Sequence, residues 1–197
     1  MIVEYDESYN ENIKDLLVEL QNHIVNIDKE KYNIITDQYR DLYFNKTMDE
    51  IKKFEGKIFL YKESDEIVGL IIGLINNEDT SEYDFKVPKR GRETELIVSQ
   101  KIRSKGIGKQ LLDRLTQHFE EVGCKAVLID VFGYNEKAIS FYEKNGYHTR
   151  LVARGVSTTA MYSPVGISPL STLVITSASM VTTWSFTVPC LWPPRLK

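Results

Sequence analysis

The chain has 197 residues, of which 42% are apolar and 27% are charged, a composition typical of a water-soluble globular protein. At about 100–200 residues per domain, this length accommodates one domain with an appendage. The 25 basic and 28 acidic residues give a net charge of −3, which gives no reason to expect nucleic acid or an anionic membrane as a partner.

Few residues of the chain are suited to bind metals or to form disulfides. The two cysteines, Cys124 and Cys190, exclude a disulfide framework and a cysteine-rich zinc module. The three histidines are scattered along the chain and predict no cluster of metal ligands. The acidic start of the chain has no apolar signal segment, and the low cysteine content suits a reducing compartment. We therefore expect a cytoplasmic protein without a metal.

Two helices are expected in the first part of the chain. Apolar residues recur there at intervals of three and four, which is typical of a helix with one buried face. These residues are Ile13, Leu16, Leu17, Leu20, Ile24 and Ile27. The pattern predicts an amphipathic helix over residues 10–27. A second helical region is expected over residues 36–54, where residues 45–47 could interrupt it.

A pair of strands follows the two helices. Lys57–Glu63 and Glu66–Asn76 are expected to be strands, joined by a turn at Ser64 and Asp65. The second strand is almost continuously apolar, which is typical of a strand that is covered on both faces. Residues 78–88 are polar and predict a loop.

The rest of the domain alternates between strands and helices. We expect, in order, a strand over residues 92–100, a helix that starts after the segment 106–108 and ends at Gly123, a strand over 125–132, a helix over 136–144 and a strand over 147–152. Hairpin-linked strands come first and strand–helix–strand units follow. This order predicts an α/β fold with a mixed sheet.

The last part of the chain, residues 153–197, differs abruptly in composition. Its charged residues are Arg154, Arg195 and Lys197, and the remainder is rich in Ser, Thr, Val and Pro. Three interpretations are open: an extension foreign to the evolved domain, a pair of additional strands, or a membrane anchor. The anchor fits least well, because residues 170–188 contain four serines and five threonines, whereas a span needs about 20 strongly apolar residues.

A short loop with two glycines, Gly106 and Gly108, joins a strand to a helix. The first N–H groups of a helix have no partner within the helix and attract anions, so this loop suits a phosphate or pyrophosphate. Glycine lets the backbone approach the anion closely, and Arg103, Lys105 and Lys109 add positive charge. A plain turn between a strand and a helix is the alternative interpretation.

Common phosphate-binding motifs fit this loop poorly. The nucleoside-triphosphate loop needs Ser or Thr after Gly-Lys, but Gln110 follows Lys109. The dinucleotide motif needs a third glycine, but Leu111 stands at that position. Taken alone, the loop therefore leaves both interpretations open, a phosphate site and a plain turn.

Two segments together resemble the GNAT superfamily of N-acyltransferases. Residues 103–108 (RSKGIG) resemble its acetyl-CoA signature, Arg-x-x-Gly-x-Gly, and residues 135–147 (NEKAISFYEKNGY) resemble its second conserved block. The resemblance extends over residues 1–152 in the order of elements and does not include residues 153–197. It implies a mixed, mainly antiparallel central sheet flanked by helices, as an acetyltransferase domain over residues 1–152, with a C-terminal extension of unclear structure.

The resemblance implies acetyl-CoA as the co-substrate. Backbone groups near Ile97 and Val98 would pair with the pantetheine arm, and N–H groups from Arg103 to Lys109 would hold the pyrophosphate. Asn135 would bond the arm, or would simply cap the next helix. The implied cofactor-binding residues are Ile97, Val98, Arg103, Ser104, Lys105, Gly106, Ile107, Gly108, Lys109, Asn135 and Tyr142.

The implied reaction is direct attack of a primary amine on the thioester. Tyr142 would donate a proton to the departing thiolate, and the Val98 N–H would polarise the carbonyl group. Glu95 is our candidate for the base, and strand alternation predicts that Glu93 shares its face. The alternatives are that Tyr142 only packs in the core and that Glu95 is only an exposed charge.

The acceptor is not readable from the sequence, and both small-molecule and protein amines are open. Tyr32, Tyr39, Tyr43 and Phe44 occupy the region that lines the acceptor site in the family, although such aromatic residues also build cores. An acyl-CoA-binding sensor without turnover is the alternative function. A homodimer is an open alternative for the assembly.

Overall fold

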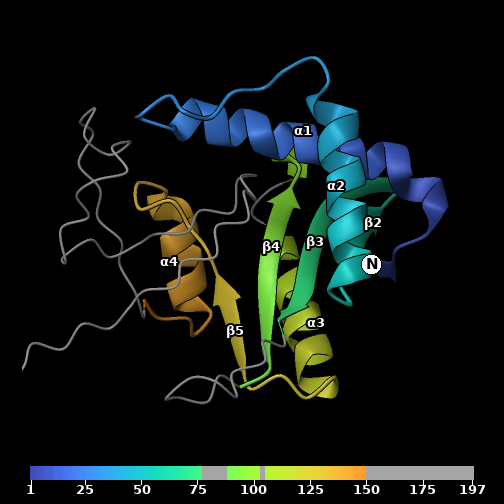
Figure 1. The fold of residues 1–197 in the computed structure, drawn as a ribbon, viewed down its shortest axis with the longest axis vertical. Coiled ribbons are helices and arrows are strands. Elements are labelled where there is room, and N and C mark those ends of the chain that lie inside the picture. The colour runs from blue at the N-terminus through green and yellow to red at the C-terminus, as the bar shows by residue number, and fades with distance from the viewer. Residues whose placement is uncertain (77–87, 103–104, 150–197) are drawn as a thin grey trace, which may run out of the picture.

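The computed structural model describes residues 1–76, 88–102 and 105–149. Our predictions for Arg103 and Ser104 and for residues 153–197 lie outside this part of the chain. The elements are β1 (Ile2–Glu4), α1 (Asn10–Ile27), α2 (Tyr39–Lys53), β2 (Lys57–Glu63), β3 (Glu66–Asn76), β4 (Arg90–Val98), α3 (Ile107–Glu121), β5 (Ala126–Ile129) and α4 (Glu136–Lys144), with short 3₁₀ turns at Glu7–Tyr9 and Gln100–Ile102 (Figure 1).

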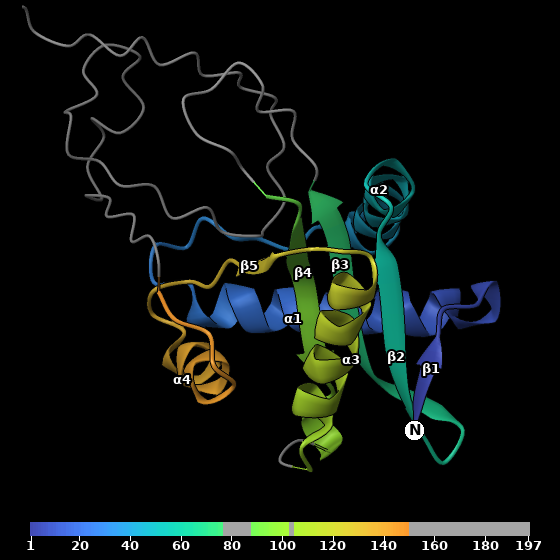
Figure 2. The same ribbon diagram turned by 90° about the horizontal axis from the view of Figure 1, so that it is seen from below.

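The described strands form one sheet in the order β1-β2-β3-β4-β5. The first three pairings are antiparallel, and β5 pairs parallel to β4. Helices α1 and α2 pack on one face of the sheet, and α3 and α4 pack on the other (Figures 1 and 2). The prediction of a mixed, mainly antiparallel sheet flanked by helices is confirmed.

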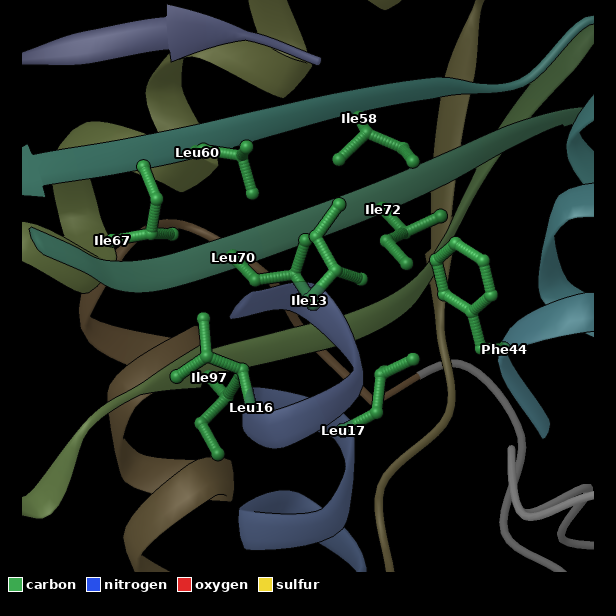
Figure 3. Packing of buried hydrophobic residues seen from close by; sticks show 10 residues of the cluster. All are labelled: Ile13, Leu16, Leu17, Phe44, Ile58, Leu60, Ile67, Leu70, Ile72 and Ile97. Carbon is green, nitrogen blue, oxygen red and sulfur yellow. The ribbon is translucent and has the colours of Figure 1, made fainter. Parts of the chain in front are cut away.

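The core has two halves, one on each face of β3. Side chains of β2 and β3 that point to one face pack against α1 and against Phe44 of α2 (Figure 3). On the other face, Phe59 and Ile71 pack against the apolar stripe of α3. Full burial of one such side chain stabilises the fold by about 1.5–3 kcal/mol, which explains why β3 is apolar at almost every position.

Several elements differ from the predictions. β1 has only three residues, too few for a periodic pattern to be read. Helix α2 continues without a break through residues 45–47, and Thr47 is buried. The strand expected over residues 125–132 is shorter, and residues 147–149 form no strand.

Among the described residues, no helix combines the length and the apolar character needed to cross a membrane.

Gly91 lets α3 approach β4 closely, and its replacement should destabilise the fold. A Cβ atom at this position would lie 2.3 Å from a ring carbon of Phe119, which is fully buried. We expect Gly91→Ala to lower the free energy of unfolding by about 1–3 kcal/mol, as overpacking does. Chemical denaturation measures the change. In the control Gly133→Ala, the new Cβ meets no atom within 4 Å, and equal losses in both variants would contradict the argument.

Candidate active site

A bulge interrupts β4 at Thr94. Ile72 of β3 pairs with Glu95, but the next residue, Gly73, pairs with Glu93, so that Thr94 is an extra residue in β4. The Thr94 hydroxyl lies 3.4 Å from the Ile72 carbonyl oxygen. A bulge of this kind shifts the alternation of side chains between the two faces of a strand.

Glu93 and Glu95 therefore lie on opposite faces of the sheet, and the prediction that they share a face is wrong. Glu93 keeps the alternation of Gly91, which contacts α3. Glu95 keeps the alternation of Ile97, which packs against α1. Both carboxyl groups are buried, with exposed fractions of 4% and 5%. The alternative that Glu95 is only an exposed charge is thus excluded.

Glu93 is paired with Tyr142 of α4. The Tyr142 hydroxyl donates a hydrogen bond of 2.7 Å to Oε2 of Glu93. Burial, together with the charge of Asp130, raises the pKa of Glu93 to about 7, although the hydrogen bond from Tyr142 acts in the opposite direction. Burial and the neighbouring Glu93 charge raise the pKa of Tyr142 well above its ordinary value. Glu93 can therefore hold or release a proton near neutral pH.

Glu95 is paired with Tyr43 of α2 on the other face of the sheet. The Tyr43 hydroxyl donates a hydrogen bond to Oε1 of Glu95. The pKa of Glu95 is raised to about 8 by burial, and the hydrogen bond from Tyr43 partly opposes this rise. Tyr39 stacks on Tyr43 with ring centroids 5.0 Å apart. A buried carboxylate of this basicity can accept a proton from an ammonium group.

The two pairs lie where β5 separates from β4. The last pair in the parallel ladder joins Glu93 to Ile129, while β4 continues to Val98. Figure 1 shows β5 leaning away from β4 toward this end. Ile97 and Val98, two predicted cofactor contacts, lie on the part of β4 beyond the ladder. An extended ligand can pair with a strand at such an edge.

The start of α3 lies beside this part of β4. Gly106 caps the helix with φ +73°, a left-handed conformation that favours glycine. The first helical bond joins the N–H of Gln110 to the carbonyl of Gly106, so the N–H groups of Ile107, Gly108 and Lys109 have no acceptor within the helix. These groups fit a pyrophosphate, and their helix end favours its negative charge.

Gly108 lies between β4 and α4. A Cβ atom at this position would lie 3.6 Å from the Phe141 ring and 3.8 Å from the Val98 side chain. The two predicted lysines at this end pair with carboxylates, Lys105 with Glu63 at 3.0 Å and Lys109 with Asp113 at 2.7 Å. Both lysine side chains are exposed, and each would have to rotate away from its carboxylate to contact an anion.

Asn135 caps α4, and its Oδ1 lies 3.3 Å from the Ala138 N–H. This contact is the one expected from the helix-cap alternative. Sequence reasoning missed the pairing of Glu93 with Tyr142 and that of Glu95 with Tyr43. The partners lie 49 and 52 residues apart, so no local pattern could have found them.

Comparison with known proteins decides the family. The sequence profile of the acetyltransferase (GNAT) family matches residues 24–147, more than half of the chain. The chain belongs to the GNAT family of acetyltransferases. The match includes β4, the start of α3 and Tyr142, and thus every element that forms the site described above.

Solved structures share the fold of this GNAT protein at low sequence identity. The BH1408 protein from Bacillus halodurans is 16% identical, with a TM-score of 0.70 over 80% of this chain and 99% of that chain. A ribosomal-protein-alanine N-acetyltransferase from Brucella melitensis biovar Abortus is 15% identical, with a TM-score of 0.59 over 80% and 99%. A glucosamine-6-phosphate N-acetyltransferase from Arabidopsis thaliana is 19% identical, with a TM-score of 0.55 over 79% and 96%.

Proposed function

We propose that the protein transfers the acetyl group of acetyl-CoA to a primary amine of a small molecule or a protein. The observation that carries this proposal is that two buried carboxyl–phenol contacts lie on opposite faces of the sheet at the β4 bulge. One contact offers a base and the other an acid, next to the strand edge and the helix start that fit the co-substrate. Residues 1–152 form the acetyltransferase domain, and the cytoplasm is its location.

Acetyl-CoA would lie between the diverging strands. The edge of β4 at Ile97 and Val98 would pair with its pantetheine arm, and the first turn of α3 would hold its pyrophosphate through the N–H groups of Ile107, Gly108 and Lys109. The thioester would then lie near the bulge, because β4 leads from the start of α3 back to Thr94.

The two pairs would divide the proton transfers between them. Glu95 would accept the proton of the attacking ammonium group, directly or through water, so that the free amine forms a bond to the carbonyl carbon. When the carbon–sulfur bond breaks, Tyr142 would give its proton to the thiolate. A protonated Glu93 would then give its proton to the Tyr142 phenolate, since the two side chains lie 2.7 Å apart.

The role of Glu95 predicts a dependence of the rate on pH. Only the ionised carboxylate can accept a proton, so the contribution of Glu95 to kcat/KM for the amine should rise about tenfold per pH unit below an apparent pKa near 8, and then level off. Initial rates between pH 6 and pH 9.5 measure this profile.

The acceptor ammonium group also loses its proton as the pH rises, so a variant is needed to separate the two effects. Glu95→Gln should have a lower rate and should keep only the part of the profile that comes from the acceptor. An identical profile in Glu95→Gln and in the wild type would show that Glu95 is not the base.

The proposed function is tested by mass spectrometry of the purified full chain with acetyl-CoA and a panel of amines. The panel should include glucosamine-6-phosphate, a peptide with an N-terminal alanine, a lysine-containing peptide and a simple alkylamine. A gain of one acetyl group by one of these amines, with release of CoA, supports the proposal. Tight binding of acetyl-CoA without transfer to any amine would support the alternative, an acyl-CoA sensor.

A further inference from the structure

A buried carboxylate at the end of α1 holds two distant loops together. Asp28 is 6% exposed. Its oxygens accept hydrogen bonds from the Asn33 N–H and side-chain amide, both at 2.8 Å, and from the Glu30 N–H at 3.0 Å. The Tyr134 hydroxyl donates a fourth bond of 2.9 Å. All four donors are neutral groups. Three of them belong to the loop that leads from α1 to α2, so this loop folds around the carboxylate.

The Tyr134 bond crosses from this loop to the segment between β5 and α4. Tyr134 stacks on Phe132 with ring centroids 5.3 Å apart, and the Asn135 N–H donates to the Phe132 carbonyl at 2.8 Å. Tyr134 therefore belongs to the turn that leads directly into α4, the helix that carries Tyr142. Figure 1 shows the end of α1 close to the start of α4.

The same loop is connected to Glu95 on its other side. The Gln21 side chain donates to the Ile34 carbonyl at 2.8 Å and accepts a long bond of 3.5 Å from the Tyr39 hydroxyl. Tyr39 stacks on Tyr43, whose hydroxyl reaches Glu95. A continuous series of contacts thus runs from the start of α4, through Asp28 and the loop, to the carboxylate on the other face of β4.

We propose that the Asp28–Tyr134 contact positions one wall of the site against α4. This wall, the acceptor side, consists of residues 28–34 together with Tyr39 and Tyr43. This inference rests on the proposed function. The two phenols of the site come from α2 and α4, which lie on opposite faces of the sheet. The Asp28–Tyr134 bond joins these two sides outside the sheet, and it therefore sets how an amine held near Glu95 is aligned with a thioester held near Tyr142.

Alignment of this kind has a large effect on rate, because a misplacement of about 1 Å can cost a factor of about 10². Removing one hydroxyl should allow a smaller displacement. Tyr134→Phe keeps the ring that stacks on Phe132 and removes only the bond to Asp28. We expect kcat/KM for the acceptor to fall about tenfold, while the Kd for acetyl-CoA changes by less than about twofold.

The experiment compares Tyr134→Phe with Tyr5→Phe in the full chain. Tyr5→Phe also removes a hydrogen bond of 2.9 Å, to Asn10 at the opposite end of α1 from Asp28, so the control should keep the wild-type kcat/KM. Hydrogen exchange of residues 28–34 is measured in parallel by mass spectrometry. The Glu30 and Asn33 N–H groups donate to Asp28, so their exchange should be faster in Tyr134→Phe and unchanged in Tyr5→Phe.

Three results would overturn the inference. The first is a wild-type kcat/KM in Tyr134→Phe, and the second is a loss of acetyl-CoA affinity as large as the fall in kcat/KM for the acceptor, which indicates general damage. The third is unchanged exchange over residues 28–34, which would show that Tyr134 does not hold the loop. The exchange result does not depend on turnover. If the wild type acetylates no amine, the proposed function fails, and exchange still decides whether Tyr134 positions the loop.

Discussion

Replacing Gly108 by glutamate is expected to lower the affinity for acetyl-CoA by about 100-fold or more. The new side chain would start between Val98 and Phe141, where β4, α3 and α4 meet and where the pyrophosphate is proposed to bind. Placing two like charges together at a binding surface costs several kcal/mol, and about 1.4 kcal/mol corresponds to a factor of ten. Isothermal titration calorimetry with acetyl-CoA measures the loss.

Gly108→Ala is the matched control for this variant. Its Cβ atom would make ordinary contacts of 3.6 Å and 3.8 Å, so both fold and affinity should be close to those of the wild type. The glutamate should not destabilise the helix either, because a negative charge in the first turn interacts favourably with the helix dipole. Equal affinity for acetyl-CoA in Gly108→Glu and Gly108→Ala would remove the start of α3 from the binding site.

Much of the fold follows from apolar patterns that are complete within a short stretch of sequence. The bounds of α1, β2 and β3 are the predicted ones, because each has a regular stripe or an unbroken apolar run. α3 begins at Ile107, inside the segment after which the helix was expected, because Gly106 adopts the left-handed conformation that ends the preceding loop. These signals are local, and the two-residue turn at Ser64 and Asp65 makes β2 and β3 antiparallel neighbours.

The arrangement of the site depended on contacts that no local pattern contains. The bulge at Thr94 has no glycine or proline to mark it, and it is set by the pairing of β4 with β3. Strict alternation along β4 therefore placed Glu93 and Glu95 on one face. The two carboxyl groups instead face different helices, and each has a phenol partner of its own, Tyr142 for Glu93 and Tyr43 for Glu95.

The pairing of Glu93 with Tyr142 links the chemistry of the site to its stability. The pKa of Glu93 is raised from 4.5 to about 7 in the folded protein, so the folded state binds more protons than the unfolded state between these values. The contribution of Glu93 to stability is therefore fully present below pH 4.5 and is lost as the pH rises to about 7. The Tyr142 hydroxyl limits this loss, because its hydrogen bond favours the ionised carboxylate.

Tyr142→Phe should lower kcat by about 100-fold, the lower end of the range for general acid catalysis. The variant keeps the ring that packs against Phe141 and Tyr147 and loses only the proton donor. An interaction made only in the transition state lowers kcat and kcat/KM together, so both should fall while the Kd for acetyl-CoA stays nearly constant. Steady-state rates at saturating acetyl-CoA measure the change, with single-turnover experiments to show that chemistry limits the rate.

The stability of Tyr142→Phe separates catalysis from packing. Without its donor, the pKa of Glu93 should rise further, so the unfolding free energies of variant and wild type should differ least below pH 7 and diverge above it. Tyr147→Phe is the control, since it loses a contact of 3.1 Å with Thr116 in the same aromatic group but has no bond to Glu93. If the role of Tyr142 were only to pack in the core, kcat per folded molecule would be preserved in both variants. An unchanged kcat in folded Tyr142→Phe, with chemistry limiting, would leave solvent as the source of the proton that the thiolate receives.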